Sequence, residues 1–273
     1  MDREFICTLL RPNLWQLQNS VGNCATLVIG GEKALLFDTM TGLGDLLGAV
    51  RELTDLPLIV VNSHGHFDHV GGNWQFDEVY LNRQDWYLME RNAHFWPEIQ
   101  KNQDKDLSHA WESFHRPEML RDLEEGDCFD LGGVTLEAVA LPGHTPGSMG
   151  LLLPSERLLL AGDAISPEMC LFFPESLGLD VYLDTLRKIM DLNLDGFVQG
   201  HFSRIFPKQV LPKLEECARL AQQGKGMAYT NSLVRMGKGR VHILSVRDPD
   251  VGGIICIITK EPGYDPEGLN ARS

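Results

Sequence analysis

Four potential metal ligands are crowded into the stretch NSHGHFDHVGGN, which spans residues 62–73. They are His64, His66, Asp68 and His69. Imidazole nitrogens and carboxylate oxygens are donors that zinc, iron and manganese all accept in proteins. In extended chain His64 and His66 face the same way, whereas Asp68 and His69 lie beyond a turn. The spacing therefore predicts one loop that serves two different metal ions.

Three more candidate ligands each close an apolar run later in the chain. LEAVALPGH ends on His144, LLLAGD ends on Asp163, and DGFVQGH ends on His201. A glycine directly precedes each of these ligands, which lets the backbone turn sharply and approach a bound ion closely. A single histidine after a strand is commonly a capped or solvated side chain, but four stretches with the same pattern favour a metal centre.

Seven ligands are too many for one four-coordinate zinc ion. They suit two adjacent ions that share a bridging carboxylate and a bridging water or hydroxide. Strands of one sheet deliver their ends to a common edge, so we expect these ligands to converge although scores of residues separate them.

Hydrophobic patterns indicate the elements that carry the ligands. Strands are predicted at residues 14–19, 24–31, 32–39, 57–63, 132–143, 149–154, 157–163, 240–246 and 253–259. Helices are predicted near residues 44–54, 180–193 and 207–223. Gly30 and Gly31 mark a hairpin, and Pro57 ends the first helix. An apolar strand thus leads straight into the histidine cluster.

Residues 84–125 differ from their surroundings because they are polar and rich in aromatic residues. We expect an inserted segment that is helical in pieces, with breaks at Pro97 and Pro117. Long insertions beside a site often form lids. The aromatic residues that would form this one are Trp86, Tyr87, Phe95, Trp96 and Trp111. The histidines expected to be solvated there are His94, His109 and His115.

Composition narrows the class of protein. The chain has 273 residues, of which 43% are hydrophobic, so it can bury a sizeable core, and we expect one domain over residues 1–273. A formal net charge of −14 without a basic stripe argues against nucleic acid and anionic membranes as partners. No apolar run suits a signal peptide or a membrane span, which predicts a cytoplasmic protein. Six scattered cysteines without a C-x-x-C pair predict reduced thiols.

The motifs SHGHFDH, PGHTPGS, LLLAGD and the GH that ends at residue 201 together resemble the metallo-β-lactamase superfamily. The resemblance covers roughly residues 14–206 in the right order. It implies an α+β fold, a four-layer αββα sandwich in which two mixed sheets pack face to face, with the helical insertion near residues 84–125. It also implies the ligand set: His64, His66 and His144 for the first metal, Asp68, His69 and His201 for the second, and Asp163 as the bridge.

A bridging aspartate is typical of the glyoxalase II-like thioesterases and lactonases of this family, whereas true β-lactamases lack it. No glutathione-binding helical domain, flavodoxin-like sequence or nuclease-like basic character is recognisable. We therefore expect a dinuclear hydrolase in which a metal-bridging hydroxide cleaves a thioester, lactone or related ester in a small molecule. Asp68 and Asp163 are the expected catalytic carboxylates, and Asp68 is also able to accept a proton.

Other readings of the same ligands stay open. An iron-dependent oxidoreductase similar to persulfide dioxygenases is one alternative, a true β-lactamase is another, and a noncatalytic binding protein is a third. Two zinc ions are the expected cofactors, with iron or manganese also compatible with these ligands. The apolar run GIICIIT could be core or the edge of a homodimer.

Residues near the ligands have candidate supporting roles. Asp38, at the end of a predicted strand, is expected to accept a hydrogen bond from a ligating imidazole. Thr145 and Ser148 either shape their loop or touch a ligand. Met169, Phe172 and Phe173 either wall a pocket or belong to the core, and Tyr182 either offers an oxyanion hydrogen bond or packs on a helix face.

Overall fold

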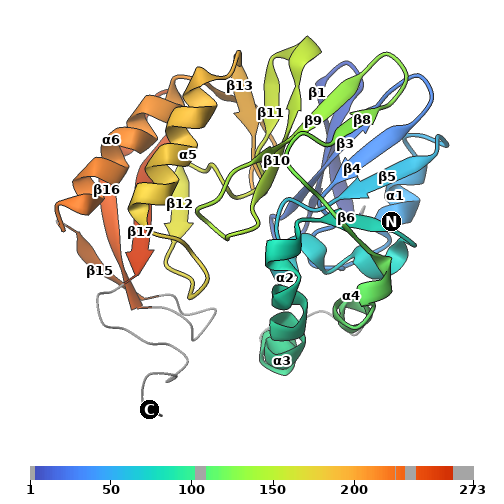
Figure 1. Cartoon of the computed structure of the whole chain (residues 1–273), viewed down its shortest axis with the longest axis horizontal. Coiled ribbons are helices and arrows are strands. Elements are labelled where there is room, and N and C mark those ends of the chain that lie inside the picture. The colour runs from blue at the N-terminus through green and yellow to red at the C-terminus, as the bar shows by residue number, and fades with distance from the viewer. Residues whose placement is uncertain (1–3, 102–108, 225, 231–237, 261–273) are drawn as a thin grey trace.

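The computed structural model describes residues 4–101, 109–224, 226–230 and 238–260, and it places two large sheets between helices (Figure 1). The first sheet has seven strands in sequence order. They are β1 (Phe5–Arg11), β2 (Leu14–Asn19), β3 (Cys24–Ile29), β4 (Ala34–Phe37), β5 (Leu58–Val61), β6 (Val79–Leu81) and β7 (Leu120–Asp122). Pairing is antiparallel from β1 to β4 and parallel from β4 to β7.

The second sheet has six strands in the order β14-β13-β11-β10-β9-β8. They are β8 (Cys128–Asp130), β9 (Thr135–Ala140), β10 (Met149–Leu153), β11 (Leu158–Leu160), β13 (Gly196–Val198) and β14 (Phe206–Pro207). All pairs are antiparallel except β11 with β13.

Central strands of both sheets are apolar on both faces, and this produces the layers. In β4, Leu35 and Phe37 enter the core between the sheets, whereas Ala34 and Leu36 pack against the helices outside. The alternation follows from the two-residue period of a strand. In β11, Leu159 likewise points outward, to the helices on the other side.

Helices cover the outer faces of the two sheets. The first sheet is covered by α1 (Leu46–Arg51), α3 (Tyr87–Lys101) and α4 (Ala110–Phe114), and the second by α5 (Leu179–Asp191) and α6 (Val210–Gln222). In α5, Tyr182, Leu186 and Ile189 recur at helical spacing and are buried against the second sheet's core. The predicted αββα sandwich is therefore confirmed.

A third sheet goes beyond the two sheets that were predicted. Its order is β12 (Glu168–Leu171), β17 (Gly253–Lys260), β16 (Lys238–Asp248) and β15 (Met227–Thr230). Strands near 240–246 and 253–259 were expected, but β12 was not, because its four residues mix a charge with apolar side chains. The sheet shares a core with α5 and α6, to which Met169 and Ile257 contribute.

The segment near residues 84–125 is helical over α3 and α4, as expected, but its end is part of the sheet. Strand β7 pairs in parallel with β6 and forms an edge of the first sheet. The lid role stays a prediction. Trp86 is half-buried against the core and its indole N–H donates to the Leu81 carbonyl at 2.8 Å, whereas Tyr87 and Trp111 are exposed.

The side chains of Phe95 and Trp96 lie outside the described residues. The three histidines of the segment, His94, His109 and His115, are exposed as predicted. All six cysteines are free, which agrees with the expected reduced thiols.

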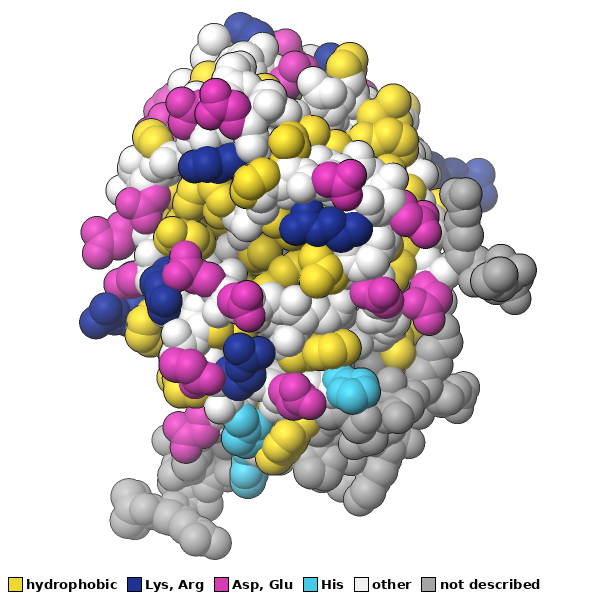
Figure 2. All heavy atoms as spheres, turned by 90° about the vertical axis from the view of Figure 1, so that its right-hand side faces the viewer, with side chains coloured by type: hydrophobic (Ala, Val, Ile, Leu, Met, Phe, Trp, Pro, Cys, Tyr) yellow, Lys and Arg dark blue, Asp and Glu magenta, His cyan; other side chains and the backbone are white. Residues whose placement is uncertain are grey.

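The surface on the right-hand side of Figure 1 carries no basic stripe. In Figure 2, which looks onto that face, lysine and arginine side chains stand singly among aspartates and glutamates. In the described part of the chain, helices that combine the length and the apolar character of a membrane span are absent.

Candidate metal centre

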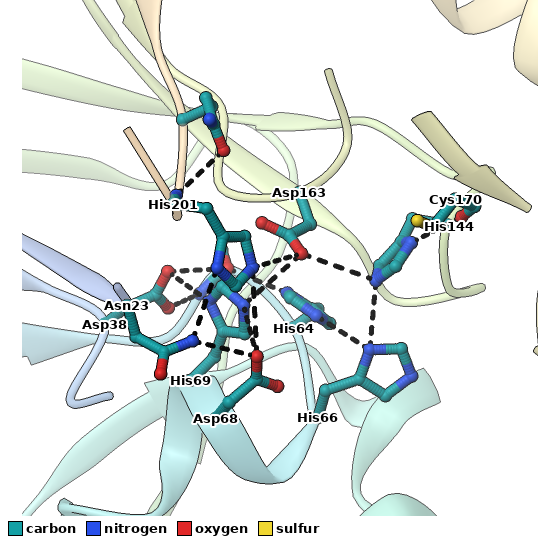
Figure 3. A network of polar contacts seen from close by, with 12 residues as sticks. Asn23, Asp38, His64, His66, Asp68, His69, His144, Asp163, Cys170 and His201 are labelled. Atoms are coloured by element: carbon teal, nitrogen blue, oxygen red, sulfur yellow. Dashed lines mark hydrogen bonds and ion pairs between the residues drawn. The ribbon is translucent and has the colours of Figure 1, made fainter. Parts of the chain in front are cut away.

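All seven predicted ligands meet at one edge of the two sheets (Figure 3). They arrive from four strand ends: the histidine loop follows β5, His144 follows β9, Asp163 follows β11, and His201 follows β13. The donor atoms form two groups, one of His64, His66 and His144 and one of Asp68, His69 and His201, and a third group of His64, His69 and Asp163 overlaps both; members of each lie within 4.8 Å of one another. The expected convergence is thus observed, while the assignment of each residue to an ion stays a prediction.

Three imidazole nitrogens form the first group. His66 Nδ1 lies 3.0 Å from His64 Nε2 and 2.9 Å from His144 Nε2. Donors around a tetrahedral zinc at the usual bond lengths are roughly 3.3 Å apart, so this spacing is close to that of a ligand set.

The protons of these imidazoles are held on the other nitrogens. His144 Nδ1 donates to the Cys170 carbonyl at 2.7 Å. His66 Nε2 lies 2.5 Å from Glu175 Oε1, a carboxylate oxygen that only accepts. His64 Nδ1 lies 2.9 Å from Ser63 Oγ, whose own proton goes to Asp38 Oδ2 at 2.9 Å.

In the neutral form of each ring the inward nitrogen then carries a lone pair, so the three lone pairs would face one point. Burial and the neighbouring histidines keep the His64 and His144 rings neutral. The pKa of His64 lies well below its usual range, and that of His144 is lowered to about 4. Converging lone pairs repel one another unless a cation lies between them. The donor set consequently fits a metal ion.

The second group contains Asp68, His69 and His201, with Asp163 between the two groups. Asp163 Oδ2 lies 2.9 Å from His201 Nε2, 3.5 Å from His69 Nε2 and 3.9 Å from His144 Nε2. Asp68 Oδ2 lies 3.9 Å from His69 Nε2 and 3.8 Å from His201 Nε2. One carboxylate oxygen of Asp163 thus faces donors of both groups.

Two buried polar atoms at this centre have no hydrogen-bond partner among the described residues. They are His69 Nε2 and Asp163 Oδ1. Burial disfavours the charged form of both groups, but their mutual attraction outweighs it. The pKa of Asp163 is held well below its usual range by His201 and His69, and Asp163, Asp38 and Asp68 raise the pKa of His69. Orphaned buried atoms in an anionic setting are what a bound cation would satisfy.

Asp38 contacts candidate ligands of both groups, and the hydrogen bond predicted for it is present. Its Oδ2 accepts from His69 Nδ1 at 2.9 Å and from Ser63 Oγ, which in turn supports His64. Its Oδ1 accepts from the Ser63 backbone N–H at 2.7 Å. Asp38 adopts a left-handed backbone conformation with φ of 70°, which is uncommon outside glycine.

Glycines before the ligands allow the close approach that the sequence suggested. A Cβ on Gly200 would lie 2.6 Å from Asp163 Oδ1 and 2.6 Å from His69 Cε1. A Cβ on Gly162, whose φ is 52°, would lie 2.4 Å from Ser63 Cβ. Neither position has room for a side chain.

Three residues that shape the centre were missed in the sequence. Glu175 contacts both His66 Nε2 and the Arg91 guanidinium, and its side chain is 3% exposed. Asn23 Nδ2 donates to Asp68 Oδ2 at 3.0 Å. Asp85 is the third, and it joins two ligand loops.

The Asp85 carboxylate is fully buried between the loop of His64 and His66 and the loop of His144. It accepts from the backbone N–H groups of Gly65 at 3.0 Å and Gly147 at 2.7 Å, and from Thr145 Oγ1 at 2.6 Å. Thr145 and Ser148 also bond to each other at 2.8 Å, so these hydroxyls shape the loop. Burial raises the pKa of Asp85.

A cavity of about 160 Å³ opens onto five of the seven ligands. The rest of its lining is Ser166, Glu168, Cys170 and Phe173. The Phe173 ring lies 4.7 Å from that of His66. Of the three predicted wall residues Phe173 takes that role, whereas Met169 and Phe172 are buried. Tyr182 lies on the inner face of α5 and is fully buried in the core.

The candidate ligands thus form a histidine–carboxylate centre at the edge of an αββα sandwich. The family model described as the metallo-beta-lactamase superfamily matches residues 20–201, and this chain belongs to that superfamily. It is a metal-dependent hydrolase of that superfamily.

Curated relatives include enzymes named for thioester substrates. The acyl-coenzyme A thioesterase MBLAC2 of Gallus gallus is 28% identical over 217 residues, which cover 71% of this chain and 73% of the relative. The enzyme of that name from Homo sapiens is 26% identical over 219 residues, covering 71% and 74%. The hydroxyacylglutathione hydrolase GloC of Haemophilus influenzae is 28% identical over 156 residues, covering 52% and 66%.

Solved structures support the fold. A metallo-β-lactamase family protein from Thermus thermophilus superposes with a TM-score of 0.55 at 22% identity, covering 82% of this chain and 84% of that one. A metallo-β-lactamase from Pontibacter korlensis superposes with a TM-score of 0.57 at 16% identity, covering 79% and 99%. At these identities the likeness concerns the fold alone.

Proposed function

We propose that this chain is a dinuclear metal-dependent thioesterase that hydrolyses a small-molecule thioester. The observation that carries the dinuclear part is the position of Asp163, whose Oδ2 faces His144 of the first group and both His69 and His201 of the second. The thioester part is supported by relatives named acyl-coenzyme A thioesterase and hydroxyacylglutathione hydrolase. Hydrolysis of another ester, such as a lactone, is the nearest variant of the proposal.

In this proposal two divalent ions, most readily zinc, are held by the two groups. His64, His66 and His144 would hold the first ion, Asp68, His69 and His201 would hold the second, and Asp163 would be shared by both. When bound, such ions lower the pKa of a coordinated water toward neutrality and polarise a substrate carbonyl.

The chain's own residues position and protect this chemistry. Asp38, Glu175 and the Cys170 carbonyl fix the rings so that their lone pairs point inward. Asp68 lines the cavity, where its carboxylate can take up the proton released in hydrolysis, and the Asn23 amide holds it in place. The Phe173 ring packs against the His66 ring at the cavity and adds an apolar surface there.

Other features of the proposal come from composition. We propose a single domain over residues 1–273 and a cytoplasmic enzyme, with a homodimer still open. The relatives named as a thioesterase and a hydrolase favour hydrolysis over the oxidoreductase alternative.

A substrate panel tests the proposal. Zinc-loaded protein and a His144→Ala variant are assayed with an acyl-coenzyme A, a glutathione thioester, a lactone and a β-lactam. We expect the highest kcat/KM for a thioester, with a loss of at least about 100-fold in the variant. Turnover of the lactone or β-lactam without thioester cleavage would overturn the assignment, as would oxygen consumption with a persulfide.

A further inference from the structure

In the described structure, one short segment supplies all of the cavity wall that the candidate ligands do not supply. Ser166, Glu168, Cys170 and Phe173 all come from residues 166–173. Within β12 the two-residue period places Glu168 and Cys170 toward the cavity, whereas Met169 and Leu171 enter the core with α5 and α6. The cavity face of β12 therefore decides what chemistry lies beside the metal centre.

Among the described residues, Glu168 is the one charged residue of this wall outside the donor groups. It is exposed, at the start of β12, and its backbone N–H donates to Ser166 Oγ at 3.2 Å. Among the described residues we find no cation paired with its carboxylate. A negative charge thus stands free at the edge of the cavity.

Two cations that contact residues 174–176, directly after this wall, are engaged there. Lys260 Nζ donates to the carbonyls of Pro174 at 2.8 Å and Ser176 at 2.7 Å, and Arg91 pairs with Glu175. In the described structure the cavity lining contains neither lysine nor arginine. A substrate anion held here would meet the Glu168 charge, and no lysine or arginine of the described lining offsets that charge.

We propose that Glu168 is a specificity-determining residue that disfavours substrates with an anionic group beside the scissile bond and favours those with a neutral or ammonium-bearing group there. This inference rests on the proposed function, because it takes the cavity as the place where the ester lies. A cavity of about 160 Å³ admits only part of a large substrate, so distant charges of a long thiol carrier fall outside the influence of Glu168.

Binding of small thiols tests this inference independently of turnover. The probes are cysteamine, 2-mercaptoethanol and thioglycolate, which share a two-carbon frame and differ in charge. Each is titrated into cobalt-loaded protein, and binding is followed by the thiolate-to-cobalt absorption. The variants are Glu168→Gln and, as a matched control, Glu137→Gln, which makes the same change at an exposed position of β9.

We expect Glu168→Gln to strengthen thioglycolate binding by about five-fold and to weaken cysteamine binding by a similar factor. The affinity for 2-mercaptoethanol should stay the same, as should all three affinities in Glu137→Gln. The difference should shrink in about 0.5 M salt, since Glu168 is exposed to solvent.

Equal changes for all three thiols, or no change in Glu168→Gln, would overturn the proposal. Failure of the proposed function would look different, because the protein would then cleave no thioester while the charge dependence of thiol binding persisted.

Discussion

At the scale of single residues, the centre depends on where each proton sits. His64, His66 and His144 each place a proton on the outward nitrogen, because Ser63, Glu175 and the Cys170 carbonyl receive it. In the neutral form of each ring the inward nitrogen is then an acceptor. Preorganised lone pairs of this kind raise metal affinity, since binding then requires no change of tautomer.

Glu175 is the partner whose replacement tests this idea most simply. In Glu175→Gln the hydrogen-bond geometry can persist but the negative charge behind His66 is lost. We predict that zinc affinity falls about 10- to 100-fold, as is usual when a carboxylate behind a ligating histidine is removed. Competition with a chelator of known affinity measures the change. An unchanged affinity would mean that Glu175 serves only to pair with Arg91.

A substitution at Tyr182 tests whether its hydroxyl takes part in catalysis or only packs in the core. Its Oη is buried and lacks a hydrogen-bond partner among the described residues. Removing an unsatisfied buried hydroxyl does not cost stability, so Tyr182→Phe should be as stable as the wild type or more stable by up to about 1 kcal/mol. Denaturant unfolding and kcat/KM should both be measured. A ten-fold fall in kcat would restore the oxyanion role.

At the scale of elements, the loops that carry the candidate ligands come from different sheets and must be held in fixed positions relative to one another. Asp85 does this for the loop after β5, in the first sheet, and the loop after β9, in the second. The residue belongs to the short turn before α3, so the segment expected to be a lid also braces the centre.

The Asp85→Asn variant tests whether Asp85 holds these two loops together. The side chain keeps its shape, but one acceptor oxygen becomes a donor that faces a backbone N–H or the Thr145 hydroxyl. We predict a loss of about 1–3 kcal/mol in the free energy of unfolding, together with weaker metal binding. Asp77→Asn, at an exposed position, is the control and should change neither. Equal stability of the two variants would show that Asp85 does not brace the loops.

The sequence predicted the residues of the centre whose pattern is visible in their immediate neighbours along the chain. The seven candidate ligands stood out because each followed an apolar run, and strand ends share an edge. Asp38 could be predicted for the same reason. Glu175, Asp85 and Asn23 are isolated polar residues in loops, and only the folded chain brings them to the ligands. The third sheet was missed because β12 joins β17 across some 80 residues of sequence.

At the scale of the whole molecule, the centre ties together strand ends from both large sheets. Metal binding to the folded chain alone stabilises it by mass action, by about 4 kcal/mol when free metal exceeds the dissociation constant a thousand-fold. We predict that treatment with a chelator lowers the melting temperature by about 10 °C and that zinc restores it. A melting temperature that does not respond to zinc would argue against a metal that links the sheets.

The most direct test of the central claim is the metal content of the purified protein beside that of a His66→Ala variant. We predict about two zinc or manganese ions per wild-type chain, and about one in the variant together with loss of hydrolysis. A single ion in the wild type, unaffected by His66→Ala, or bound iron without any hydrolysis, would contradict the dinuclear hydrolase.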